Sequence, residues 1–145
     1  MMISPARLRL LQLLALVGIG VCGYLFYAKL TSQFFCPIGD CAKVNDSSFA
    51  YVGPVPVSLL GATYYVFLLA LLQFVKEKGN WVLRWMLGAS LLIGLLYSTF
   101  LTVVEVVVIE AVCMWCVVSF LLVVAMNAIG FVRIKEKVDQ LDVRR

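Results

Sequence analysis

Long apolar runs separated by short polar segments dominate the chain. The four runs cover residues 8–28, 57–75, 81–104 and 111–132. Each run is close to the about 20 residues that an α-helix needs to cross the hydrocarbon core of a bilayer. The pattern therefore predicts an all-α membrane protein, a four-transmembrane-helix bundle formed by a single domain over residues 1–145.

The first run also has the form of a signal peptide, because Arg7 and Arg9 stand at its start. It is longer than the apolar core of a typical signal peptide, and no small-x-small cleavage site follows it. A lipoprotein-type cut before Cys22 would place the branched Val21 where a small residue is needed. We therefore expect the first helix to be retained.

The segment 31–56 breaks the apolar pattern and carries the signals of a loop. Its turn-forming residues are Pro37, Gly39, Gly53, Pro54 and Pro56, with the polar stretch Asn45-Asp46-Ser47-Ser48. Aromatic residues in such a loop suit a position on the membrane surface; here they are Phe34, Phe35, Phe49 and Tyr51. We predict a cap loop between the first two helices.

The composition supports a bilayer as the solvent. Of the 145 residues, 63% are apolar and 14% are charged, and the mean hydropathy is +1.03. Soluble domains average about 45–50% apolar and about 25% charged residues. The chain has no His, which excludes Ser-His-Asp and Cys-His catalysis, His-ligated haem and His-containing zinc sites.

The basic residues indicate how the helices are oriented. Ten of the twelve Lys and Arg residues lie near the N-terminus, near the turn at 76–80 or in the tail 133–145, and the other two are Lys29 and Lys43. The positive-inside rule then places the tail in the cytoplasm, and the 31–56 loop outside it. The net charge of +4 is explained by this topology, without a nucleic-acid partner.

Four of the five cysteines form two close pairs. Cys36 and Cys41 lie in the predicted loop, and Cys113 and Cys116 form a C-x-x-C motif where the fourth helix enters the membrane. A helix N-terminus favours the thiolate, the form that attacks disulfides. We predict two redox-active pairs on the extracytoplasmic face. Cys22 lies alone within the first run and is expected to pack as a small apolar residue.

Three other interpretations of the pairs stay open. Two structural disulfides would staple a non-enzymatic four-helix protein, although a disulfide stabilises most when it closes a long loop. The four cysteines would also satisfy a C-x4-C and C-x2-C zinc site, which the oxidising compartment disfavours. Inert packing of thiols is the third interpretation, and it does not account for a C-x-x-C motif.

Thiol oxidation needs an electron acceptor. The sequence has no Gly-rich dinucleotide motif and no haem attachment motif, so we expect a quinone dissolved in the bilayer, held in an apolar pocket among the helices. Cys116 lies about 4.5 Å deeper than Cys113 along an inward helix, which assigns Cys116 to the quinone and Cys113 to the loop pair. Glu105 and Glu110 lie shortly before the C-x-x-C motif. They either help to deliver protons to the quinone or are solvated charges at a helix boundary.

The order of these features resembles the vitamin K epoxide reductase family. The likeness is carried by the loop pair, the Pro-Val-Ser-Leu-Leu-Gly sequence at 56–61 and the C-x-x-C at 113–116, and it extends from about residue 8 to 132. The resemblance implies a four-helix bundle around a quinone, in a prokaryotic member that works like the disulfide-forming membrane protein DsbB. The cofactor would be ubiquinone or menaquinone, with a vitamin K type also open.

The resemblance also implies the role of each site residue. Cys113 and Cys116 match the active-site pair, with Cys116 next to the quinone. Cys36 and Cys41 match the shuttle pair, in which Cys41 exchanges with Cys113 and Cys36 exchanges with the partner. Ser58 matches the family's Ser or Thr near the active site, whereas on sequence alone it is equally an N-cap or first-turn residue.

Two departures from the family pattern narrow the function. Animal members that reduce vitamin K carry an Asn and a Tyr where this chain has Val57 and Phe120. Many bacterial members carry a fused thioredoxin-like domain, so the partner here is expected to be a separate thioredoxin-like, DsbA-like protein. We predict a quinone-dependent thiol oxidase in a prokaryotic inner membrane. The alternative enzyme is a vitamin K quinone or epoxide reductase of the endoplasmic reticulum.

Overall fold

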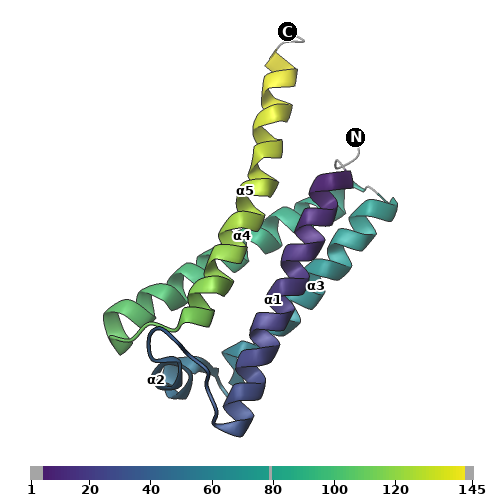
Figure 1. Ribbon diagram of the computed structural model, residues 1–145. Coiled ribbons are helices and arrows are strands. Elements are labelled where there is room, and N and C mark those ends of the chain that lie inside the picture. The colour runs from purple at the N-terminus through teal and green to yellow at the C-terminus, as the bar shows by residue number, and fades with distance from the viewer. Residues whose placement is uncertain (1–4, 79, 143–145) are drawn as a thin grey trace.

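Four long helices make up most of the structure, a computed structural model that describes residues 5–78 and 80–142, with side chains for 5–77 and 80–130 (Figure 1). They are α1 (Pro5–Thr31), α3 (Val57–Lys78), α4 (Trp81–Val104) and α5 (Met114–Asp142). The N-terminal end of α1 and the C-terminal end of α5 lie at one end of the molecule. The predicted helical architecture is confirmed.

Three segments of the described chain are long and apolar enough to cross a membrane. They are Pro5–Thr31, Val57–Glu77 and Trp81–Ile109, while the apolar part of α5, Met114–Gly130, is shorter. These lengths support an integral membrane protein. The third segment begins at Trp81, as the sequence predicts, and extends to Ile109, past the predicted end at residue 104.

Two boundaries differ from the sequence prediction. The segment 105–110 is not a simple linker, because a π-helical turn, η2 (Glu105–Ile109), continues α4. The backbone carbonyl of Glu105 accepts the N–H groups of Glu110 and Ala111, and Glu110 ends the turn in a left-handed conformation at φ 51°. In the predicted tail 133–145, the described residues 133–142 continue α5, and residues 143–145 lie outside the described range.

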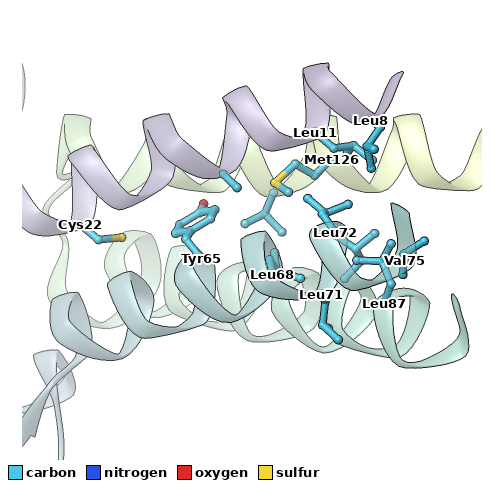
Figure 2. Close-up of a cluster of buried hydrophobic side chains, with 13 residues drawn as sticks. Leu8, Leu11, Cys22, Tyr65, Leu68, Leu71, Leu72, Val75, Leu87 and Met126 are labelled. Atoms are coloured by element: carbon cyan, nitrogen blue, oxygen red, sulfur yellow. The ribbon is translucent and has the colours of Figure 1, made fainter. Parts of the chain in front are cut away.

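The helices pack around one buried apolar cluster, with α1 and α3 side by side (Figure 1). Figure 2 shows Cys22 and Tyr65 at one end of this cluster, and Leu8 and Leu11 at the other. A Cβ atom at Gly18 would lie 2.4 Å from the ring of Tyr65, so a glycine is required where α1 meets this ring. Small residues at such crossings let membrane helices approach closely.

The segment 32–56 forms small elements instead of an open loop. It holds the helix α2 (Cys41–Asp46), the 3-10 turn η1 (Ser48–Ala50) and a two-residue hairpin of β1 (Tyr51–Val52) and β2 (Val55–Pro56). Asp40 caps α2, accepting the N–H of Lys43 on its side chain at 3.0 Å. Figure 1 shows α2 between the C-terminal end of α1 and the junction of α4 with α5.

The aromatic residues of this segment divide into two groups. Phe35, Phe49 and Tyr51 are exposed, as a surface position predicts. Phe34 packs instead against the buried cluster that contains two of the cysteines. One aromatic residue therefore helps to hold the segment against the helices.

Candidate functional site

The fold brings the two cysteine pairs together. Cys36 and Cys41 form a disulfide with a Cα–Cα separation of 6.0 Å, whereas Cys113 and Cys116 are free thiols. Cys41 and Cys113 are both fully buried and belong to one apolar cluster. Cys36 is only partly buried at the edge of that cluster. The loop pair thus has an inner sulfur beside Cys113 and an outer one nearer the surface.

A backbone contact holds the loop pair in this position. Gly39 forms an isolated antiparallel bridge with Cys113, and the N–H of Asp40 donates to the carbonyl of Val112 at 3.0 Å. Gly39 has φ 88°, and a Cβ atom there would lie 2.0 Å from the Val112 carbonyl oxygen. Only glycine combines this backbone angle with so close an approach.

Asn45 of α2 links the two pairs, a role that sequence reasoning missed. Its buried side-chain amide donates to the carbonyl of Cys41 at 2.9 Å and to the sulfur of Cys113 at 3.9 Å. The ammonium of Lys29 donates to the Asn45 carbonyl at 2.5 Å and lies 3.7 Å from the centre of the Tyr51 ring. The available signal was spacing, because an Asn four residues after a helical Cys reaches its carbonyl.

Cys113 directly precedes α5, and its carbonyl accepts the N–H of Val117 at 3.0 Å, as in a helical turn. A hydrogen bond with the Cys116 thiol lowers the pKa of Cys113, and the backbone N–H groups of Cys116 and Trp115 add to this effect. Burial and the charge of Glu105 act in the opposite direction. The balance favours the thiolate, as the C-x-x-C at a helix start predicts.

We expect the rate of alkylation of Cys113 in the reduced protein to rise with pH through a midpoint below the ordinary cysteine value. Replacing Cys116 with Ala removes the thiol hydrogen bond that lowers this pKa, and should move the midpoint to higher pH. Cys116→Ser keeps a hydroxyl donor and should retain most of the effect. Iodoacetamide labelling followed by peptide mass spectrometry measures all three midpoints; equal values would refute the contribution of the thiol hydrogen bond.

A cavity of about 290 Å³ lies among the helices beside Cys116. Its wall is mostly apolar and includes Cys116, Ser58 and Glu105. Ser58 is the second residue of α3 and is buried, and its hydroxyl has no hydrogen-bond partner. A buried hydroxyl without a partner is costly unless a ligand completes it.

The cavity fits the quinone that the sequence predicts. It is near the lower end of the size range of small-molecule pockets and has the expected apolar wall with few polar groups. Ser58 supplies a hydroxyl donor suited to a quinone carbonyl, and among the buried hydroxyl groups of the described cavity wall it is the one without a hydrogen-bond partner. Val57 also lines the cavity and offers no donor.

The remaining candidate residues differ in how deeply they are buried. Cys22 is buried in the helix core, as expected for packing, and also reaches the cavity wall. Glu110 is exposed, which agrees with a solvated charge at a helix boundary, but Glu105 is 5% exposed and contradicts that interpretation. Within the described residues, no group of three or more Cys, Asp or Glu is placed to hold a metal ion.

Comparison with known proteins supports the resemblance seen in the sequence. The model of the vitamin K epoxide reductase family matches residues 9–131. This range includes both cysteine pairs, Ser58 and Glu105. A comparison with curated proteins finds no match.

Proposed function

The chain belongs to the vitamin K epoxide reductase family, a family of oxidoreductases that use quinones, and we propose that it oxidises protein thiols with a membrane quinone. Its substrate would be a separate thioredoxin-like, DsbA-like protein, which it would reoxidise for disulfide formation outside the cytoplasm. The observation that carries this proposal is the arrangement of the two pairs. The disulfide-bonded pair Cys36–Cys41 lies against the free thiols Cys113 and Cys116, and Cys116 borders an apolar cavity.

The burial of the sulfurs sets the order of exchange in this proposal. The partly exposed Cys36 takes the attack of the partner's thiolate, and Cys41 leaves as a thiolate. The partner's second thiol then releases Cys36, which leaves the partner oxidised and the loop pair reduced. Two electrons and two protons have moved from partner to loop.

The second exchange transfers the electrons to the helix pair. The Cys41 thiolate attacks Cys113 of an oxidised Cys113–Cys116 pair, and Cys116 leaves as a thiolate at the cavity wall. Cys36 then attacks Cys41 and frees Cys113. The side-chain amide of Asn45 stabilises the Cys113 thiolate when it leaves. A bound quinone supplies the two-electron acceptor that restores the helix pair, and Ser58 is placed to hold its carbonyl.

The state of the thiols favours this cycle over a stapled scaffold. In a scaffold, both short-range pairs would be closed for good, but Cys113 and Cys116 are free while Cys36 and Cys41 are bonded. A dedicated vitamin K epoxide reductase is less well supported, because Val57 gives the cavity wall an apolar group where animal members carry an amide.

The direct test supplies the purified protein with a reduced thioredoxin-like donor and, in separate reactions, with ubiquinone, menaquinone or vitamin K epoxide. We expect one quinone to be reduced for each donor dithiol oxidised, and no turnover by Cys113→Ala. Reduction of vitamin K epoxide in preference to both quinones would favour the alternative enzyme. Failure of the wild-type protein to reduce any acceptor would refute the proposed function.

We also propose that the chain crosses a prokaryotic cytoplasmic membrane four times, with the 32–56 segment outside. The arrangement in Figure 1 agrees with this, because α2 lies at the opposite end from the N-terminal end of α1 and the C-terminal end of α5. The separation of Lys and Arg along the sequence sets the direction.

The orientation predicts how two single-cysteine variants respond to a reagent that cannot cross membranes. In a chain lacking the native cysteines, Ser48→Cys should be labelled in intact cells, and Lys76→Cys only after lysis. Both positions are exposed, so accessibility within the protein is matched. The reverse pattern would overturn the orientation and the oxidising environment that the cycle requires.

A further inference from the structure

Glu105 is a buried acid in direct contact with the free cysteine pair. It is 5% exposed and stands at the junction of α4 and η2, on the wall of the cavity. Its carboxylate accepts the backbone N–H of Cys113 at 3.5 Å, and Glu105 and Cys116 line the same cavity. The π-helical turn that begins at Glu105, directly after α4, places this acid next to Cys113, the residue directly before α5.

No cation balances this carboxylate among the described residues of the cavity wall. The wall contains no Lys or Arg; its titratable residues besides Glu105 are Cys22, Tyr64, Tyr65, Tyr97 and Cys116. The ammonium of Lys29 donates to the carbonyl of Asn45 and lies over the ring of Tyr51. A buried carboxylate without a cation gains free energy by taking up a proton, so Glu105 is suited to accept one from a group on the same cavity wall.

Resting on the function proposed above, we infer that Glu105 accepts the proton of the Cys116 thiol when the helix pair is reoxidised. The overall step converts two thiols into one disulfide and releases two electrons and two protons. The electrons go to the quinone, and the S–H bond of Cys116 is exchanged for an O–H bond on Glu105. From the cavity wall this proton is available to the reduced quinone, which takes up two protons in all.

Glu110 provides a matched control five residues away. It is exposed and ends the π-helical turn through its backbone, so its carboxylate lies outside the cavity wall. A Gln substitution keeps the size of either side chain and a carbonyl acceptor for a backbone N–H, but it cannot accept a proton. A difference between the two variants therefore reports the buried position of Glu105 instead of net charge at this end of the protein.

The first measurement is quinone reduction by the full-length protein. General acid–base catalysis contributes about 100-fold or more to rates, so Glu105→Gln should lower the rate of quinone reduction by about 100-fold. Glu110→Gln should stay within about twofold of wild type. The wild-type rate should rise with pH as Glu105 ionises, and this limb of the profile should be missing in Glu105→Gln.

The second measurement needs no quinone and separates this role from a merely structural one. The negative charge of Glu105 opposes the Cys113 thiolate, so Glu105→Gln should shift the alkylation midpoint of Cys113 to lower pH. A misfolded site would lose the contacts that lower the pKa of Cys113 and would move the midpoint up instead, so a lower midpoint together with slower quinone reduction is not explained by misfolding. Glu110→Gln should leave the midpoint unchanged.

The outcomes distinguish the two proposals. If wild-type protein reduces quinone and Glu105→Gln matches it, Glu105 does not take the proton, and the proposed function stands. An unchanged alkylation midpoint in Glu105→Gln would also overturn the inference, because Glu105 would not be ionised beside Cys113. If wild-type protein reduces no quinone while the midpoint still shifts, the proposed function fails.

Discussion

The Cys116→Ala variant is expected to accumulate a disulfide between Cys41 and Cys113 and to lose all quinone-linked turnover. In this variant, the Cys113 thiolate attacks the Cys36–Cys41 bond at the buried Cys41, and Cys36 leaves as a thiolate. The exchange conserves one disulfide and needs no oxidant. The mixed disulfide can then break only by the reverse attack of Cys36 on Cys41, because Cys116, the thiol that would otherwise attack Cys113 and carry the exchange forward, is missing. Digestion without reductant and mass spectrometry identify the cross-linked peptides.

A second variant approaches the same bond from the opposite direction. Cys36→Ala leaves Cys41 as a lone thiol, which attacks an oxidised Cys113–Cys116 pair and releases Cys116. Because Cys36 cannot reclaim Cys41, the Cys41–Cys113 bond should accumulate again. Cys22→Ala is the matched control, since it removes a buried thiol outside both pairs and should trap nothing. A Cys36–Cys113 bond, or no bond in either variant, would refute this electron route.

The helices could be predicted from the sequence because each depends on a local pattern. The run 81–104 has the same bounds as α4, since it is predominantly apolar and its first residue follows a polar turn. The closeness of the cysteine pairs also followed from topology, because both lie at the same end of neighbouring helices. These features need no information about contacts between distant residues.

The site depends on contacts that no local pattern contains. The sequence around Glu105 predicts a solvated charge at a helix boundary, because charged residues are common there. The structure shows that Glu105 begins a π-helical turn and that its side chain is buried. The sequence around Asn45 predicts a turn, whereas its side chain contacts Cys113, a residue 68 positions away in the sequence. From the sequence, Gly39 is only one of several turn-forming residues of a loop. In the structure its pairing with Cys113 leaves no room for a side chain, so glycine is required there.

Gly39→Ala is expected to uncouple the loop pair from the helix pair while leaving the helix pair active. Alanine at φ 88° is strained by about 1–3 kcal/mol. Its Cβ atom would also lie 2.0 Å from the Val112 carbonyl oxygen, so the segment must move away from Cys113. A docking penalty of about 3 kcal/mol lowers the docked population about 100-fold. Turnover with a reduced thioredoxin-like donor should fall by a similar factor.

Gly53→Ala is the matched control, because Gly53 also has a positive φ, 62°, but no atom lies within 4 Å of a Cβ there. It introduces a comparable backbone strain without a collision and should retain most of the turnover. A small dithiol such as dithiothreitol reduces Cys113–Cys116 directly, so Gly39→Ala should turn over normally with it. If Gly39→Ala and Gly53→Ala were equally active with the protein donor, the bridge at Gly39 would not govern transfer. A loss with both donors would instead show that the substitution damages the helix pair itself.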